Sequence, residues 1–402
     1  MIKPELINQI HNATVIQRWN DHIRPSTGFA EIDKQAHKTF FAYVLAKCQA
    51  EEDENFNTCA LVEGLIFEFL HRSVLTDIKP PIYYKLKSKM GNGIDEWVAD
   101  ELSDCIDCIP GGFAERFRRY YADPDYCKEE KAIIQYAHYL ATKWEFDIIY
   151  PMNIGFYNIE TTRKEVNDGL ARCTWFEGKK YFSQHPRLTD FLNLIGQLRF
   201  QMRWTATARI PQTSVMGHTL VVAILSYLFT VEMGGCDQRK VNNFFGGLFH
   251  DLPEVLTRDI ISPIKRGVKG IDNILKDIED QQMQSVVFPL MPEKWREEIS
   301  YFTMDEFDSK IKLDGKIQVS NSDLLNAVYN KDEFCPIDGE IIRGCDHLSA
   351  YMEAIMSVKN GVEAQPLLVA LKNLAAIYKG KKIGGIAFEP YFKKDIYWTE
   401  VK

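Results

Sequence analysis

His250 and Asp251 are adjacent in a stretch, 242–256, whose apolar residues recur at helical spacing. A charged side chain in a largely apolar helix must find a partner or a metal ion. An imidazole and a carboxylate together suit a divalent ion such as Mn, Co, Fe or Zn. Two adjacent side chains converge on one ion only when other helices supply further ligands. The pair therefore predicts a metal site that distant residues complete.

Two further ligands are predicted. His218 lies among apolar neighbours on the preceding predicted helix, and Asp323 begins an apolar helical face in residues 318–325. A buried histidine is more often a satisfied core residue than a ligand, and His-Asp dipeptides often arise by chance. Taken one at a time, each of these residues could therefore have a purely structural role.

The elements that carry these residues are predicted to be helices. Apolar residues recur every three or four positions along much of the chain, and strand-like alternation is scarce. The clearest such stretches are 42–50, 60–70, 218–231 and 241–256. Asp237, which follows two glycines, is expected to cap a helix. The sequence therefore predicts an all-α fold.

Composition bounds the class of protein. A chain of 402 residues, 46% of them hydrophobic, predicts two globular domains with substantial cores. The net charge of −8 argues against a general nucleic-acid binder, which needs clustered cations. No signal peptide is apparent, and the longest apolar run, 221–231, is too short to span a bilayer. Nine cysteines without framework spacing indicate reduced thiols, so a cytoplasmic protein without membrane partners is expected.

The two halves of the chain share landmarks in the same order. Arg18-Trp19 followed by His37 resembles Arg203-Trp204 followed by His218, and a Val-Leu-Thr segment before prolines occurs at 74–76 and at 255–257. The offset stays near 181 to 185 residues, which favours a tandem duplication over coincidence. The predicted domains are residues 1–178, a degenerate copy, and 184–402, the catalytic copy with an aromatic C-terminal tail.

The order His218, His250-Asp251, Asp323 resembles that of the HD-domain phosphohydrolases. Residues 250–265 are similar to the His-Asp-x-x-Glu-Val-x-Thr-x-Asp-x-x-x-Pro-x-Lys stretch of the bacterial 5′-deoxynucleotidase branch, and Arg203-Trp204 resembles that branch's Arg-Trp pair. The resemblance covers roughly residues 188–358. It departs before the first ligand, where Gly217 replaces the usual acidic residue.

The resemblance implies a role for each matching residue. The four ligands would hold one divalent ion (Co, Mn, Zn, Fe or Mg), which activates a water and polarises a phosphoryl group. Glu254 or Asp259 would act as general acid or base, and the sequence does not separate the two. Arg203 would clamp the phosphate, Trp204 would press against the sugar and favour deoxyribose, and Lys265 would add a further cation.

The first half lacks part of this set. His37 matches the first histidine, but residues 67–69 replace the His-Asp pair, and no aspartate lies near 138–140, where the last ligand is expected. Catalysis by this half is therefore not expected. Arg18 and Trp19 remain either for packing or for a regulatory nucleotide pocket. The half is expected to act as an internal partner in a monomeric pseudo-dimer, although a homodimer is also compatible with the sequence.

The predicted function is metal-dependent release of phosphate from nucleoside 5′-monophosphates, plausibly deoxyribonucleotides. One alternative is an HD hydrolase of another nucleotide phosphoester, such as a triphosphate, a cyclic nucleotide or an alarmone. The other is a non-catalytic nucleotide sensor, but the full ligand set argues for catalysis, because a sensor does not need an activated water.

Overall fold

The computed structural model describes residues 1–76, 78–258 and 271–397. Its fold is all-α, as predicted, with only two small antiparallel hairpins among the described residues. The chain divides into two compact units. Unit 1 consists of residues 1–11, 105–112 and 201–402, and unit 2 of residues 12–104 and 113–200. The division therefore follows Phe200, whereas the domains predicted from the sequence meet between residues 178 and 184.

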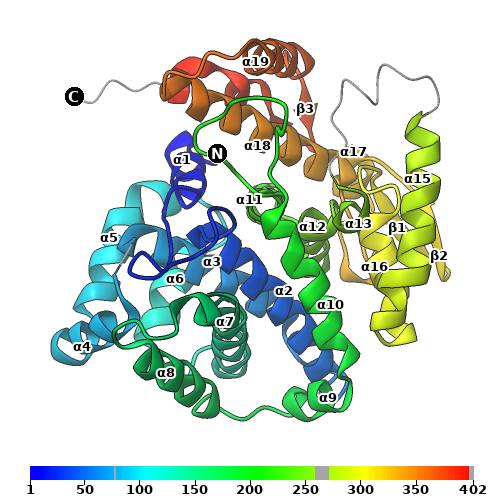
Figure 1. Cartoon of the computed structure of the whole chain (residues 1–402). Coiled ribbons are helices and arrows are strands. Elements are labelled where there is room, and N and C mark those ends of the chain that lie inside the picture. The colour runs from blue at the N-terminus through cyan, green and yellow to red at the C-terminus, as the bar shows by residue number, and fades with distance from the viewer. Residues whose placement is uncertain (77, 259–270, 398–402) are drawn as a thin grey trace. The chain divides into compact units, whose positions relative to one another are not determined.

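Unit 2 is built around a long buried helix (Figure 1). Its elements are α2 (Glu31–Ala50), α3 (Thr58–Leu75), α4 (Pro80–Met90), α5 (Gly93–Ile106, whose last two residues fall in unit 1), α6 (Phe113–Ala122), α7 (Lys128–Ile149), η1 (Tyr150–Asn153), α8 (Ile159–Ala171), α9 (Gly178–Gln184), α10 (Arg187–Gly196) and η2 (Gln197–Phe200). Helix α2 packs against α3, α7, α9 and α10 and is buried along most of its length.

Unit 1 begins with α1 (Pro4–Asn12), takes in the short segment 105–112, and continues from residue 201. Its other helices are α11 (Val215–Glu232), α12 (Asp237–Phe249), α13 (Glu254–Thr257), α15 (Ile271–Gln282), α16 (Glu293–Thr303), α17 (Ser322–Ala327), α18 (Gly339–Lys359) and α19 (Gln365–Ile377). Short turns of helix occur at η3 (Met283–Val287), η4 (Phe288–Leu290), η5 (Asp332–Phe334), η6 (Glu389–Phe392) and η7 (Lys394–Tyr397). Strand β1 (Lys310–Leu313) pairs with β2 (Lys316–Val319), and β3 (Lys382–Ile383) pairs with β4 (Ile386–Ala387).

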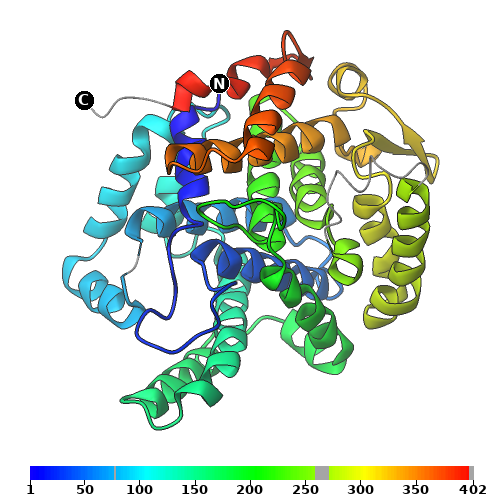
Figure 2. The same cartoon turned by 45° about the horizontal axis from the view of Figure 1, so that its top comes forward.

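Helices α11, α12 and α18 form the core of unit 1, and Figures 1 and 2 show the green α11 and α12 beside the orange α18. Helix α11 begins at the cap Ser214, whose side chain accepts a hydrogen bond from the amide of Gly217. Gly247 lets α12 come close to α11, because a Cβ at this position would lie 3.0 Å from the backbone of Ala223. This close approach places the end of α12 beside the start of α11.

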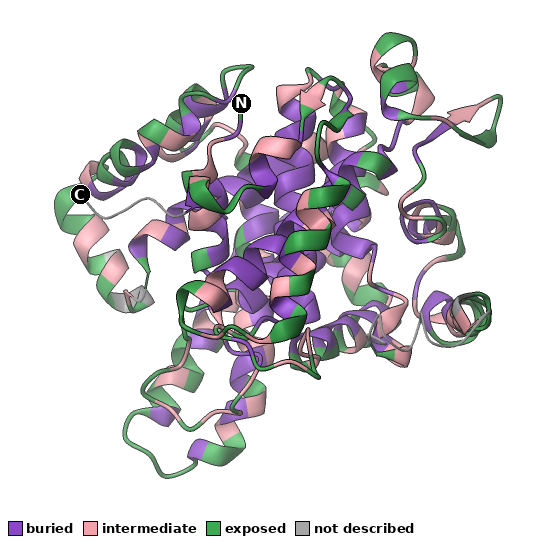
Figure 3. Cartoon of the chain, turned by 90° about the horizontal axis from the view of Figure 1, so that it is seen from above, coloured by how far each residue is buried: buried purple, intermediate pink, exposed green. Residues whose placement is uncertain are grey.

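Burial distinguishes α11 from a membrane helix. Its 18 residues are long and apolar enough to cross a bilayer, but 94% of them are buried inside the protein. Such burial is typical of the core helix of a soluble protein. Figure 3 shows long stretches of fully buried helix next to helices that are exposed along one face. The cytoplasmic location stays a prediction.

Candidate metal centre

His218 is fixed in the first turn of α11. Its amide donates to the carbonyl of Ser214, and its side chain is fully buried. The ring nitrogen Nδ1 lies 3.0 Å from Oγ of Ser349, and Nε2 lies 3.0 Å from Oδ1 of Asp346. Burial and the charge of Arg203 lower the pKa of His218, but its hydrogen bonds to Asp346 and Glu353 outweigh them and raise it. The ring is thus held rigidly with Nε2 directed at a carboxylate.

His250 and Asp251 lie on the turn that follows α12. Nδ1 of His250 donates to the carbonyl of Gly247 at 2.8 Å, because a carbonyl can only accept. The other nitrogen, Nε2, therefore carries the lone pair, which is the tautomer that binds a metal ion. Nε2 of His250 and Oδ2 of Asp251 are both buried without a hydrogen-bond partner. Such atoms are rare in folded proteins and indicate a missing ligand.

Asp346, on α18, completes the group in place of Asp323. One ligand atom from each of His218, His250 and Asp346 lies within 4.8 Å of the others, and this is the only such group among the described residues. Asp323 is instead exposed on the first turn of α17 and is not part of the group. Asp323 was predicted because it begins an apolar helical face, but its carboxylate is exposed to solvent in the structure.

The sequence did contain a signal for Asp346. It precedes Glu353 by seven residues in the long apolar helix α18, so both carboxylates lie on one helical face. Acidic residues repeated on an otherwise buried face need a cation. Burial raises the pKa of Asp346, but the hydrogen bond and charge of His218 and the charges of His250 and Arg203 hold it well below its usual range. The carboxylate is therefore ionised at neutral pH.

Arg203 and Trp204 flank the group on the segment before α11. The indole Nε1 of Trp204 donates to Oε2 of Glu353 at 2.7 Å, and Nε of Arg203 lies 3.4 Å from the same oxygen. Nη1 of Arg203 lies 3.7 Å from Oδ2 of Asp251. Trp204 has a φ of 60°, a strained conformation that indicates a functional constraint. Glu353, which the sequence reasoning did not select, thus orients the Arg-Trp pair.

Glu353 is buried among cations. Burial raises the pKa of this carboxyl, but Arg203, Arg209 and the hydrogen bond from His218 lower it well below the usual value. The carboxylate accepts from the hydroxyl of Thr213 at 2.8 Å as well. Its charge therefore helps to fix the direction of the Arg203 guanidinium.

Glu254, the first predicted acid or base, is not on a continuous helix with His250. Helix α12 ends at Phe249, and Glu254 begins the separate short helix α13 after Pro253. Proline lacks the amide that would continue the hydrogen-bond ladder, so the helix breaks at this point. The continuous helix on which Glu254 was expected to face the same way as His250 is therefore interrupted, and Glu254 is half-buried after the break. Asp259 and Lys265 lie outside the described residues.

Glu306 is a second acidic residue that the sequence reasoning missed. Burial raises its pKa, and the charge of Asp251 adds to this, while the charge of His250 lowers it. A carboxyl with a raised pKa near a metal group is a candidate proton donor. No motif in the sequence distinguishes Glu306 from the acidic residues around it.

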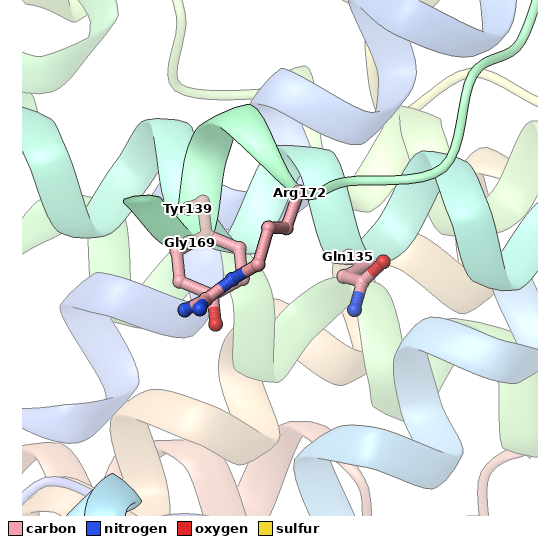
Figure 4. Close-up of a pocket in the computed structure, with 4 residues that line it drawn as sticks. All are labelled: Gln135, Tyr139, Gly169 and Arg172. Atoms are coloured by element: carbon pink, nitrogen blue, oxygen red, sulfur yellow. The ribbon is translucent and has the colours of Figure 1, made fainter. Parts of the chain in front are cut away.

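A surface hollow of about 250 Å³ lies elsewhere, in unit 2, between α7 and α8. Figure 4 shows its lining residues, Gln135, Tyr139, Gly169 and Arg172. It contains no histidine or carboxylate that could activate a water. The hollow therefore offers no catalytic group of this kind.

Comparison with known proteins gives a family match for part of the chain. Residues 195–374 match the model of a family described as an HD domain. This region is similar to the HD-domain phosphohydrolases. Three relatives match part of the chain at low identity, each over about three quarters of its own length. They are 4′-phosphooxetanocin A phosphatase of Priestia megaterium (26% identical, 43% of this chain, 76% of the relative), a 5′-deoxynucleotidase of Vibrio atlanticus (22%, 43%, 77%) and a 5′-deoxynucleotidase of Pasteurella multocida (24%, 37%, 75%).

Proposed function

We propose that this HD phosphohydrolase releases phosphate from nucleoside 5′-monophosphates, deoxyribonucleotides included. The observation that carries the proposal is the unsatisfied pair of atoms, Nε2 of His250 and Oδ2 of Asp251, next to the Arg203-Trp204 pair. The names of the relatives support a nucleotide or a similar phosphorylated compound as the substrate.

His218, His250, Asp251 and Asp346 would hold one divalent ion. This donor set of two imidazoles and two carboxylates suits Mn, Co, Fe or Zn. When bound, the ion would polarise the phosphoryl group and lower the pKa of a coordinated water. The hydrogen bond from His250 to the carbonyl of Gly247 and the contact of His218 with Ser349 orient both rings for this role.

Arg203 would bind the phosphate oxygens. Glu353 holds its Nε, so the guanidinium is directed before the substrate arrives, and less side-chain entropy is lost on binding. The bond from Trp204 to Glu353 likewise fixes the indole, whose flat face would contact the sugar. An apolar surface rejects an added hydroxyl only weakly, so we expect at most about 100-fold preference for deoxyribose over ribose.

Proton transfer to the leaving 5′ oxygen needs a proton donor. Glu306 is one candidate, because burial raises its pKa and the charges of His250 and Asp251 act on it, and Glu254 and Asp259 are the other candidates. A Glu306→Gln variant keeps the size of the side chain and removes its proton. If Glu306 is the acid, this variant loses the activity on monophosphates but retains metal binding.

The test is phosphate release from a panel of deoxyribo- and ribonucleoside 5′-monophosphates, with triphosphates and cyclic nucleotides alongside. Metal-stripped protein is resupplied separately with Co, Mn, Zn, Fe and Mg, and Asp251→Ala is the negative control. Metal-dependent release from monophosphates that vanishes in the variant supports the proposal. Turnover of the triphosphates or cyclic nucleotides alone would assign a different phosphoester, and binding without any turnover would indicate a sensor.

A further inference from the structure

Unit 2 repeats the local geometry of the metal centre. Trp19 has a φ of 57°, close to the 60° of Trp204. Its indole donates to Oε2 of Glu145 at 2.8 Å, and Nε of Arg18 lies 2.9 Å from that oxygen. This is the arrangement that Arg203 and Trp204 make with Glu353. Arg18 and Arg203 are also equally exposed, at 14% each.

The backbone around the two Arg-Trp pairs is repeated as well. The amide of Arg18 donates to the carbonyl of Phe29, as the amide of Arg203 does to that of Thr213. Each pair then precedes the first turn of a long helix, α2 or α11. These matches support the degenerate copy that the sequence landmarks predict, and they allow positions to be compared one by one.

Lys34, rather than His37, stands at the position of His218. The amide of Lys34 donates to the carbonyl before α2, as the amide of His218 does before α11. His138 in turn stands where Asp346 is expected, because each lies seven residues before the glutamate that holds the Arg-Trp pair. The Lys34 ammonium contacts Nδ1 of His138, as His218 contacts Asp346. His37 instead contacts the carbonyl of Leu192.

These replacements reverse the charge of the site. The metal centre in unit 1 gathers the carboxylates of Asp251, Asp346 and Glu353 and therefore needs a cation. In unit 2 the basic side chains outnumber the carboxylates that pair with them. The basic side chains are Arg18, Lys34, Lys38, Arg72 and Arg199, and the carboxylates are Glu31, Glu68 and Glu145. A buried group with excess positive charge is stabilised by an anion.

Lys34 has no carboxylate of its own among its described contacts. The neighbouring Glu31 bonds to Arg18 at 2.9 Å and lies 3.4 Å from Arg72, and Glu145 bonds to Arg18 and Arg199 at 2.9 Å each. Lys34 itself is fully buried and contacts only a histidine. Its burial, then the charges of Arg18 and Lys38, lower its pKa well below the ordinary value.

We propose that unit 2 carries a second, metal-independent binding site for the phosphate group of a small phosphorylated molecule, formed by Arg18, Lys34 and Arg72. Arg18 corresponds to the phosphate clamp of the catalytic unit, and Lys34 offers a buried amine at the position of a metal ligand. A bound phosphate would stabilise the charged form of this amine, which the burial and the neighbouring cations disfavour. Arg72, 21% exposed, is reachable from solvent. The ligand is a nucleotide or free phosphate, and occupancy of this site does not require turnover at unit 1.

The test uses the full chain in EDTA with Arg203→Ala, which removes the phosphate clamp of unit 1. Binding of inorganic phosphate and of dAMP is measured by calorimetry. The measurement is then repeated on the double variant that carries both Arg203→Ala and Lys34→Met. Methionine keeps the length of the side chain, and Lys143→Met, on the exposed face of α7, removes the same charge elsewhere as a control. We expect Lys34→Met to weaken binding at least about tenfold and Lys143→Met to leave it unchanged.

Equal affinities for dAMP and phosphate would identify the phosphate group as the whole ligand, and tighter binding of dAMP would identify a nucleotide. No binding in Arg203→Ala, or binding that Lys34→Met does not weaken, overturns the proposal. Metal-dependent hydrolysis by Lys34→Met in an otherwise native chain shows that unit 1 is intact. If Lys34→Met does not fold, Arg72→Gln, at the more exposed edge of the cluster, takes its place in the test. The same loss of affinity for phosphate and dAMP is then expected. Because these measurements are made without metal, they are independent of the proposed nucleotidase activity.

Discussion

Asp346 and Asp323 provide a direct test of the metal centre, because the structure and the sequence pattern select different aspartates. Asp346→Asn keeps the shape of the side chain but removes a half-buried charge 3.0 Å from the ring of His218. Changes to residues that only orient a ligand already cost 10–100-fold in metal affinity. Loss of a ligand carboxylate is therefore expected to weaken metal binding at least about 100-fold, or about 2.7 kcal/mol.

This loss should appear in thermal unfolding as well as in activity. At a metal concentration of about 100 times the wild-type Kd, binding stabilises the folded protein by about 2.7 kcal/mol. A 100-fold weaker variant gains only about 0.4 kcal/mol at the same concentration. The metal-induced rise in melting temperature should therefore almost vanish in Asp346→Asn. The metal-free variant should itself be less stable than the metal-free wild type, because the depressed pKa of Asp346 shows that the folded protein favours the carboxylate beside His218, His250 and Arg203. The comparison is therefore the metal-induced shift within each protein.

Asp323→Asn is the matched control. Asp323 is exposed in the first turn of α17, so the change costs at most about 0.5 kcal/mol through the helix dipole. Phosphate release and the metal-induced stabilisation should both remain at wild-type levels. Full activity of Asp346→Asn together with inactivity of Asp323→Asn would refute the metal centre as the structure places it.

Three further perturbations follow from named contacts. Arg203→Lys should lower kcat/KM for a nucleotide by about 10–100-fold, because an ammonium cannot replace the planar guanidinium fork. Arg18→Lys should leave steady-state hydrolysis at saturating metal unchanged. Equal losses in the two variants would contradict the assignment of Arg203 as the catalytic phosphate clamp. Burial lowers the pKa of His11 from 6.5 to about 4, so the folded protein favours the neutral ring. The free energy of unfolding should therefore be unaffected by this residue above pH 6.5 and should decrease as the pH falls from 6.5 toward 4. In His11→Gln, this decrease should be smaller by up to about 3 kcal/mol. Deletion of residues 1–11 should lower the free energy of unfolding by more than about 3 kcal/mol, because their apolar side chains are buried in unit 1, and an unchanged melting temperature would show that this segment does not stabilise the unit.

The predicted isolated catalytic domain illustrates the difference between sequence order and tertiary structure. A fragment from residue 184 would lack α1, which belongs to unit 1, and would retain α10, which belongs to unit 2. In α1, Leu6, Ile7 and Ile10 are fully buried. No local pattern assigns α1 to the later half of the chain, because an amphipathic helix reveals that it has a buried face but not what covers that face.

The sequence by itself determined the all-α fold and the resemblance to HD-domain proteins, because helical spacing and the motif around His250 and Asp251 are local properties. It also drew attention to the Arg203-Trp204 pair, which the structure places beside Asp251. Which aspartate joins the candidate metal group was decided only by the tertiary structure. Asp323 and Asp346 both begin or follow apolar helical faces, and only the packing of α18 against α11 brings one of them to His218.

The second site was hidden for the same reason. Sequence order matched His37 to His218, since both are histidines after an Arg-Trp pair. The backbone hydrogen bonds at the start of α2 instead place Lys34 there, three residues earlier, which is nearly one helical turn. Residues three positions apart lie at different heights along the helix axis, and the side chains of a ligand site must be placed to within about 0.5 Å. Residue types and approximate spacing therefore specified the chemistry, and the contacts between helices decided which residues perform it.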